Sequence, residues 1–316
     1  MRALAAPDKF RGTLTAREAA AAIAAGAERA GWAADELPLA DGGEGTLDLI
    51  GGGNRLTTVT GPLGNPVKAA WRLEADGTAL IEAAQACGLT LAGGPERNDP
   101  LRATSRGVGE LVAAAVAERA GRIVVFVGGV ASTDGGAGAT EAVPHPLRVP
   151  LDVACDVDAR FLDAADVFAP QKGATPEQVQ ILHERLEKLV VPDVPGSGAA
   201  GGLAGGLAAI GARLLPGFDL VADWVGLDGH LAQASLVVTG EGLVDATSAT
   251  GKVVGRVLAR AQEAGVEALV VAGDVAPSSP IEALSLVASY GHERALAEPA
   301  ECLTELVATT LAARRN

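Results

Sequence analysis

Positive charge, cysteine and long apolar runs are scarce in this sequence, and each shortage excludes a class of protein. The 316 residues include 25 Lys and Arg against 39 Asp and Glu, and the formal net charge of −14 argues against binding to nucleic acid. The three cysteines, Cys87, Cys155 and Cys302, stand far apart without the spacing of a zinc site, so a reduced, cytoplasmic setting is expected. No apolar run reaches the length of a membrane span, and the N-terminus lacks the apolar core of a signal peptide.

Three widespread functional motifs are also missing. The chain contains neither the Gly-x-x-x-x-Gly-Lys-Ser/Thr phosphate loop nor a Gly-x-Gly-x-x-Gly dinucleotide fingerprint in a strand, turn and helix setting. It has no Gly-x-Ser-x-Gly nucleophile elbow, and none of its four histidines lies near a Ser or Cys in a nucleophile motif. A P-loop enzyme, a common dehydrogenase and a serine hydrolase are therefore disfavoured.

Local patterning favours an α/β protein with two domains. Both ends of the chain show the alternation of strands and helices that is typical of a parallel sheet, whereas residues 56–82 alternate as antiparallel hairpins do. We therefore expect a parallel-sheet domain made of residues 1–59 and 231–316, with a mixed α/β domain inserted over residues 60–230. A cleft between two such domains is a usual place for an active site.

The individual elements are expected as follows. Strands are predicted over 3–6, 36–40, 122–127, 149–155, 235–239, 268–271 and 284–288. Helices are predicted over 15–30, 46–50, 105–120, 176–189, 200–214, 251–264, 280–283 and 299–313, the first with Thr15 as its N-cap.

Charged residues follow the first two expected strands, at the edge where open parallel sheets bind ligands. The first loop contains Asp8, Lys9 and Arg11, and the alternative is a solvated loop. The second contains Asp41 and Glu44 among glycines, which let the backbone approach a ligand or simply form the turn. Phosphoryl transfer needs cations for phosphates, carboxylates for magnesium and an acceptor for the hydroxyl proton, so these loops are candidates for that chemistry.

Two further loops lie in the middle of the chain. The glycine-rich loop over residues 128–138 could direct backbone N–H groups at phosphates, with Ser132, Thr133 and Asp134 adding polar groups. Asp156 and Asp158 stand two residues apart at a strand end and could share a magnesium ion, although helix capping is the alternative. A glycine-rich loop alone is weak evidence for nucleotide binding.

The last loop gathers two acids and a lysine. Glu241 and Asp245 follow an apolar strand, and Lys252 comes after Thr250 and Gly251 at the start of the next helix. These charged side chains are expected at one edge of the sheet, so this is the most functional-looking cluster in the sequence.

The ordered motifs together resemble those of the glycerate kinase family. The sequence carries Ala-Pro-Asp-Lys-Phe-Arg-Gly-Thr-Leu at 6–14, Ala-Asp-Gly-Gly-Glu-Gly-Thr at 40–46, Val-Thr-Gly-Pro-Leu-Gly at 59–64, Ala-Cys-Asp-Val-Asp at 154–158, Ala-Pro-Gln-Lys-Gly-Ala-Thr-Pro-Glu at 169–177, Gly-Ala-Ala-Gly-Gly-Leu at 198–203 and Thr-Gly-Glu-Gly at 239–242. With the loop at 128–138, the resemblance covers nearly every segment from residue 1 to about residue 273.

The resemblance implies a two-domain α/β protein, one domain with flavodoxin-like topology, that transfers the γ-phosphoryl group of ATP, with Mg²⁺, to D-glycerate. The 2-hydroxyl is the expected phosphoryl acceptor, and 3-phosphoglycerate is the less favoured product. Assembly into a homodimer is a further possibility. The implied catalytic residues are Asp41, Asp158, Lys9 and Asp245, and the implied substrate contacts are Asp8, Lys9, Arg11, Glu44 and Arg106. The implied ATP contacts are Gly128, Gly129, Ser132, Thr133, Asp134, Gly135, Gly136, Lys172, Glu241 and Lys252, and the implied Mg²⁺ ligands are Asp156 and Asp158. The sequence does not separate the proton acceptor from the metal ligands.

Several positions depart from the family pattern. The connection over residues 138–153 is short where relatives carry another strand and helix. Lys9 replaces a serine, Arg106 a tyrosine, Val108 a threonine and Leu243 an arginine. A kinase of another small hydroxy acid, and a weakly active ligand-binding or regulatory homologue, are therefore the alternatives.

Overall fold

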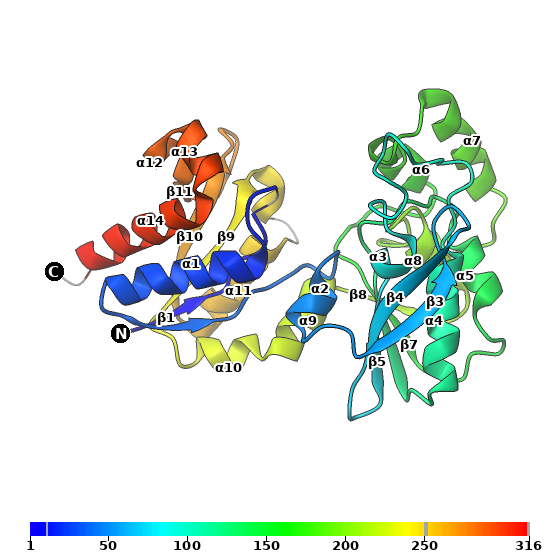
Figure 1. The fold of residues 1–316 in the computed structure, drawn as a ribbon, viewed down its shortest axis with the longest axis horizontal. Coiled ribbons are helices and arrows are strands. Elements are labelled where there is room, and N and C mark those ends of the chain that lie inside the picture. Colours follow the sequence, from blue (N-terminus) through cyan, green and yellow to red (C-terminus); the bar gives the residue numbers. More distant parts are fainter. Residues whose placement is uncertain (11, 250–251, 315–316) are drawn as a thin grey trace. The chain divides into compact units, whose positions relative to one another are not determined.

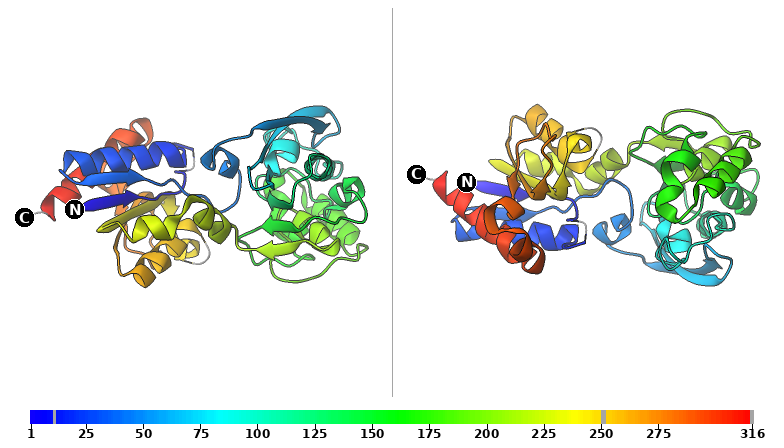
Figure 2. Two further views of the ribbon diagram at one scale, coloured as in Figure 1. Left: turned by 90° about the horizontal axis from the view of Figure 1, so that it is seen from below. Right: turned by 90° about the horizontal axis from the view of Figure 1, so that it is seen from above.

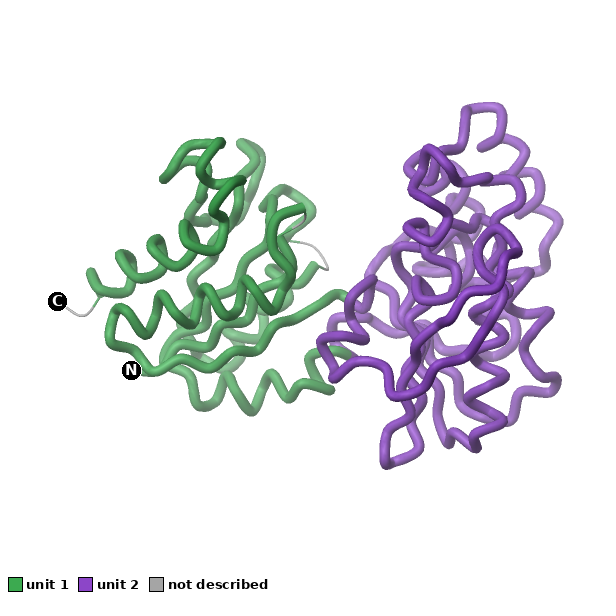
Figure 3. The backbone as a smooth tube through the Cα atoms, in the orientation of Figure 1, with its two compact units in different colours: residues 1–41, 221–316 green, residues 42–220 purple. Residues whose placement is uncertain are grey.

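The computed structural model describes residues 1–10, 12–249 and 252–314. The chain forms two compact units, one made of Met1–Asp41 and Val221–Asn316 and the other of Gly42–Leu220 (Figure 3). The domain boundaries expected from the sequence, after residues 59 and 230, lie at different positions. The first observed boundary comes earlier because β3 (Arg55–Thr60) pairs with a strand of the second unit.

The described part of the first unit contains a five-stranded parallel sheet. Its strands are β1 (Arg2–Ala5), β2 (Ala33–Glu36), β9 (Leu236–Val244), β10 (Glu267–Val275) and β11 (Leu284–Ser285), in the spatial order β11-β10-β9-β1-β2. Counted along the unit, this is the 2-1-3-4-5 order of flavodoxin-like folds, so the expected topology is confirmed. The order reverses between β1 and β9, and such a switch point is where these sheets bind ligands at their carboxyl edge.

Helices cover both faces of this sheet (Figures 1 and 2). On one face α1 (Ala16–Arg29) packs against α14 (Pro299–Ala313), so closely that a Cβ at Gly26 would meet the Thr304 carbonyl oxygen at 2.6 Å. On the other face α11 (Val253–Ala264) packs through Val254. The remaining elements of this unit are α10 (Leu227–Leu231), η2 (Ala246–Ala249), α12 (Leu286–Tyr290) and α13 (His292–Ala297).

The described part of the second unit is built on a six-stranded mixed sheet. Its strands follow one another in space as they do in sequence: β3, β4 (Pro66–Leu73), β5 (Thr78–Glu82), β6 (Arg122–Phe126), β7 (Leu151–Ala154) and β8 (Arg213–Leu215). The pairs β3–β4 and β4–β5 are antiparallel, as the hairpin pattern predicted, and the other pairs are parallel. The carboxyl ends of β5 to β8 therefore meet at one edge.

The helices of the second unit connect these strands (Figure 1). They are α2 (Thr46–Leu49), α3 (Ala84–Cys87), α4 (Arg106–Ala117), α5 (Ala137–Ala142), α6 (Ala164–Phe168), η1 (Pro170–Lys172), α7 (Pro176–Leu186) and α8 (Leu203–Ala209). The chain leaves this unit within α9 (Gly217–Val225). No helix in the described ranges of either unit is both long and apolar enough to cross a bilayer.

Four predicted elements differ from the structure. The helix expected over 200–214 is only α8, because Gly211 (φ +99°) follows it and β8 then pairs with β7. The strand expected over 284–288 is β11 followed at once by α12, whose N-cap is Ser285. The four residues 280–283 form no helix, being too few to sustain one.

The fourth difference concerns the second strand, which was expected over 36–40. The observed strand β2 is shifted to Ala33–Glu36. Parallel backbone bonding nevertheless continues beyond it, from the Leu37 N–H to the Ala5 carbonyl and from the Leu39 N–H to the Pro7 carbonyl. The second strand and its partner therefore run together towards the loops that contain Asp8 and Asp41.

Candidate active site

Three carboxylates gather at the switch point of the first unit. Asp8 follows β1, and its backbone N–H donates to the Gly240 carbonyl of β9 at 2.9 Å. The pKa of Asp8 is raised from 3.8 to about 7, chiefly by burial and then by the charges of Asp41 and Glu241, while Lys9 opposes the rise through its backbone N–H and its charge. The carboxyl ends of β1, β2 and β9 thus bring together acids that lie far apart in the sequence. A carboxyl group with this pKa can accept a proton near neutral pH.

The loop after β9 joins Asp245 and Lys252 as the sequence predicted. Their charged groups lie 3.7 Å apart, and the Lys252 side chain is 41% exposed. Asp245 also shapes the turn, because it accepts hydrogen bonds from the Thr247 hydroxyl (2.6 Å) and the backbone N–H of Thr247 (2.8 Å) and Ser248 (3.2 Å). The Thr247 hydroxyl is the largest contribution that lowers the pKa of Asp245.

Some predicted residues lie outside the described ranges. Arg11, assigned a substrate contact, is one of them, as are Thr250 and Gly251, which precede Lys252.

In the second unit the loop over residues 42–46 packs on the carboxyl ends of neighbouring strands. A Cβ at Gly128, just after β6, would lie 2.8 Å from the Gly43 Cα, and one at Gly129 would lie 2.7 Å from Glu44 Oε2. Glycine is therefore required at Gly128 by close approach of backbone within the protein itself, whereas at Gly129 the neighbour is the Glu44 side chain and the φ of +64° favours glycine. Glu44 is exposed and lies beside the predicted phosphate loop.

Glu82 contacts this loop and was not among the site residues predicted from the sequence. It is the last residue of β5, is 2% exposed, and accepts a hydrogen bond from the Leu47 N–H at 3.0 Å. A glutamate that ends an otherwise apolar strand was the available signal in the sequence.

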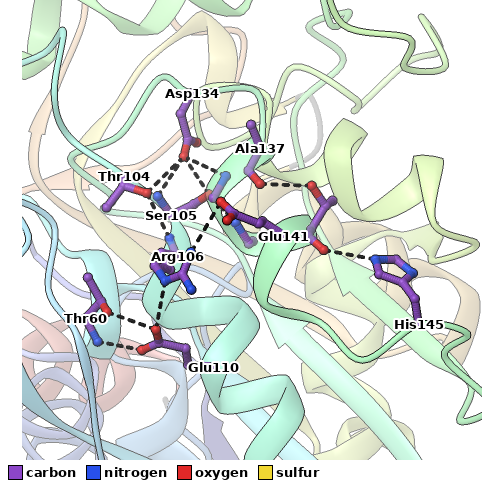
Figure 4. A network of polar contacts seen from close by, with 12 residues as sticks. Thr60, Thr104, Ser105, Arg106, Glu110, Asp134, Ala137, Glu141 and His145 are labelled. Carbon is purple, nitrogen blue, oxygen red and sulfur yellow. Dashed lines mark hydrogen bonds and ion pairs between the residues drawn. The ribbon is translucent and has the colours of Figure 1, made fainter.

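The glycine-rich loop is braced by its own aspartate (Figure 4). Asp134 accepts hydrogen bonds from the Ser105 N–H (2.8 Å) and hydroxyl (2.9 Å) and from the N–H groups of Gly136 (3.2 Å) and Gly138 (3.3 Å). It thereby ties the start of α5 to the start of α4. The observed contacts of Asp134 are structural, and a contact of this residue with ATP stays a prediction.

Lys172 supports the same loop from inside the protein. Its side chain is buried, and its Nζ donates to the Ser132 carbonyl at 2.5 Å and to the Thr133 hydroxyl at 3.4 Å. Burial lowers the pKa of Lys172 to about 8, opposed by the charges of Cys87 and Asp134. The observed contacts of Lys172 hold the loop, and a contact of this residue with the ATP phosphates stays a prediction.

Arg106, a predicted substrate contact, is engaged by two carboxylates (Figure 4). Its Nε lies 3.1 Å from Glu110 and its Nη1 lies 3.3 Å from Glu141. Glu110 also accepts hydrogen bonds from the backbone and hydroxyl of Thr60. Val108, two residues further along α4, is fully buried, so its departure from the family pattern concerns core packing.

The two predicted metal ligands differ in their surroundings. Asp156 accepts hydrogen bonds from the N–H groups of Gly217 (2.9 Å) and Phe218 (2.7 Å), which is the capping role considered as the alternative. Asp158 is exposed. Within the described residues no group of three or more His, Cys, Asp or Glu side chains is arranged to hold a metal ion.

Comparison with known proteins identifies relatives over the whole chain. The model of the glycerate kinase family matches residues 3–147 and 143–311. An uncharacterized protein of Mycobacterium tuberculosis is 41% identical, covering 99% of this chain and 91% of the relative. Glycerate 2-kinase of Escherichia coli is 36% identical over 80% of each chain, and glycerate kinase of Bacillus subtilis is 37% identical over 88% of this chain and 86% of the relative.

A solved structure supports the same relationship. The crystal structure of a protein from Salmonella typhimurium LT2, provisionally assigned as glycerate kinase 2, superposes with a TM-score of 0.78. The two chains are 32% identical, and the match covers 100% of this chain and 98% of the other. The two ranges matched by the family model meet within the short connection between α5 and β7, where the sequence departs from the family pattern.

Proposed function

The chain belongs to the glycerate kinase family, and we propose that it transfers the γ-phosphoryl group of ATP to the 2-hydroxyl of D-glycerate, giving 2-phosphoglycerate and ADP. Support for this product comes from the Escherichia coli relative named glycerate 2-kinase. Formation of 3-phosphoglycerate is the less favoured outcome.

The observation that carries the proposal is the gathering of Asp8, Asp41 and Glu241 at the switch point of the first unit, where burial and the neighbouring charges raise the pKa of Asp8. In the proposed reaction, the glycerate hydroxyl oxygen attacks the γ-phosphorus as the bond from that phosphorus to the β,γ-bridging oxygen breaks. The hydroxyl proton passes to Asp8, whose pKa of about 7 suits a general base at neutral pH. Asp41 is the second candidate for this role, and its charge keeps the pKa of Asp8 high.

Three cations, Lys9, Arg11 and Lys252, are proposed to hold the anionic groups of the substrates. Lys9 follows Asp8 directly and is proposed to bind the glycerate carboxylate together with Arg11. Lys252, half-exposed beside Asp245, is proposed to face the ATP phosphates. The loop over residues 128–136 is proposed to approach the phosphates through its backbone.

Mg²⁺ is proposed as the cofactor, bound through Asp156 and Asp158. The donors fit a hard cation, which commonly takes one or two carboxylates and completes its shell with water and phosphate oxygens. Asp158 is exposed, while Asp156 already accepts two backbone hydrogen bonds. The bound ion would neutralise charge on the phosphates.

The test is a steady-state assay of ADP release with ATP, Mg²⁺ and a panel of small hydroxy acids that includes both glycerate enantiomers. We expect turnover with D-glycerate that stops when EDTA removes Mg²⁺. A higher kcat/KM for another acid would favour the alternative kinase, for which the replacements at Lys9 and the half-exposed Leu243 are the structural reason. Thermal stabilisation by D-glycerate without turnover would favour the ligand-binding homologue.

A further inference from the structure

Glu82 lies in surroundings that are unfavourable for a carboxylate. It is 2% exposed, and burial raises its pKa, with the acidic neighbours Asp48 and Glu44 adding to the effect. Hydrogen bonds from the backbone of Leu47 and Gly45 oppose this rise. Among the described residues Glu82 forms no ion pair with a lysine or arginine. A buried carboxylate without a cationic partner is costly, so its retention calls for a specific role.

The two backbone groups that bind Glu82 belong to the start of α2. A helix leaves its first N–H groups without partners inside the helix, and a side chain at the N-cap usually accepts from them. The N-cap of α2 is Gly45, which has φ +93° and no side chain to do so. Glu82 supplies the missing acceptor from a strand that lies 35 residues further along the chain. Its negative charge also suits the positive end of the short helix.

The loop before α2 is held by close packing against neighbouring glycines and by a hydrogen bond within the loop. Gly43 packs against Gly128, and Glu44 packs against Gly129. Thr46 is fully buried, and its hydroxyl donates a hydrogen bond to the Gly43 carbonyl at 2.7 Å. The hydrogen bonds to Glu82 therefore anchor one end of a loop whose other residues include the exposed Glu44.

We propose that Glu82 is a positioning residue that holds the backbone of residues 45–47 and thereby fixes Glu44 for contact with glycerate. The inference rests on the proposed function, because the substrate contact of Glu44 belongs to it. Glu82 itself is buried beneath the loop and acts through the backbone. Loosening this anchor should weaken glycerate binding, whereas a merely structural loss would lower the amount of active enzyme and leave both KM values unchanged.

The test compares Glu82→Gln with Thr175→Ala, which removes the N-cap of α7 in the same unit. Glutamine keeps the shape of glutamate but offers one acceptor oxygen, so one of the two N–H groups loses its partner. We expect hydrogen exchange at Gly45 and Leu47 to become about tenfold faster. We also expect KM for D-glycerate to rise about fivefold or more with KM for ATP unchanged. The control should change neither exchange at these two amides nor either KM value.

A second variant guards against a folding defect. Glu82→Asp keeps the charge but draws the carboxylate back by one methylene group, so the same exchange and KM pattern is expected. Unchanged exchange at Gly45 and Leu47 in both variants would overturn the anchoring role. Faster exchange with KM for glycerate unchanged would overturn the positioning role. If the wild-type protein has no kinase activity, the proposed function fails, and exchange alone decides whether Glu82 anchors the loop.

Discussion

The charge of Asp41 adds to burial in raising the pKa of Asp8 to about 7, although the two residues follow different strands of the parallel sheet. Because the pKa of Asp8, the proposed base, depends on the charge of Asp41, the role of Asp8 can be tested by titration.

Replacing Asp41 by Asn should move the acid limb of the pH–rate profile to lower pH. In the wild-type protein kcat/KM for D-glycerate should fall as the pH drops through about 7, because Asp8 is then protonated and accepts no proton. Asp41→Asn removes one like charge, so the pKa of Asp8 and the midpoint of the limb should fall by about 0.5 to 1 pH unit. The exposed Glu263→Gln on α11 serves as control and should leave the midpoint in place. An unshifted limb in Asp41→Asn would contradict Asp8 as the base.

Replacing Asp8 by Asn should make the protein more stable and less active by about tenfold or more. The folded state holds a proton on Asp8 up to a pH of about 7, whereas the unfolded chain releases it near 3.8, so stability is lost as pH rises between these values. The gain in melting temperature of Asp8→Asn should therefore grow from pH 4 to 7 and stay constant above, reaching about 2 °C or more. Differential scanning calorimetry across this range provides the check. A variant less stable than wild type at pH 8 would refute the assignment of a costly buried charge.

Replacing Asp152 by Asn should lower stability without touching the reaction. This carboxylate on β7 is fully buried and binds Arg122 and Arg213, each at 2.7 Å. Burial alone would raise the pKa of Asp152, but hydrogen bonds from Arg213 and Arg122 outweigh it and lower the pKa, so its contribution persists above about pH 4 and is lost only in stronger acid.

For Asp152→Asn we expect a loss of about 2 kcal/mol or more in the free energy of unfolding, measured by urea denaturation at pH 7. The exposed pair of Arg160 and Asp193, 3.6 Å apart, gives the control. Asp193→Asn should cost less than about 0.5 kcal/mol. Equal losses in the two variants would show that burial of the Asp152 ion pairs adds nothing to the free energy of unfolding.

Adding a methyl group at Gly128 should disturb the loop that carries Glu44. The new Cβ would lie 2.8 Å from the Gly43 Cα, a backbone atom that cannot move aside cheaply. Gly128→Ala should cost about 1 to 3 kcal/mol and lower kcat/KM for D-glycerate. Gly121→Ala, where the Cβ meets nothing within 4 Å, should leave both quantities near wild type. Thermal melts and steady-state kinetics of the two variants would show whether stability and kcat/KM fall because of the close approach at Gly128 or because any glycine is replaced.

The elements that were predictable from the sequence carry their own local signals. α14 begins at Pro299 and ends at Ala313 as expected, because proline is favoured in the first turn of a helix. α1 follows Thr15, which forms a capping box with Glu18. The convergence of Asp8 and Asp41 was predictable because parallel strands end at the same edge of a sheet.

What the sequence did not reveal depends on contacts between distant segments. β8 is only three residues long and is a strand because it pairs with β7. The alanine-rich segment that precedes it favours helix. Glu82 was missed because its partner Leu47 is 35 residues away. Lys172 was predicted as an ATP contact, and its burial against the Ser132 carbonyl was not predicted from the sequence. Local patterns cannot encode such pairings.

The most direct test of the central claim is identification of the phosphorylated product by ³¹P NMR after incubation with ATP, Mg²⁺ and D-glycerate. The account predicts 2-phosphoglycerate and ADP in equal amounts with the wild-type protein. It predicts a rate lower by about tenfold or more with Asp8→Asn, corresponding to about 1.4 kcal/mol of barrier. Absence of phosphoglycerate with the folded wild-type protein, or an unchanged rate with Asp8→Asn, would contradict the account.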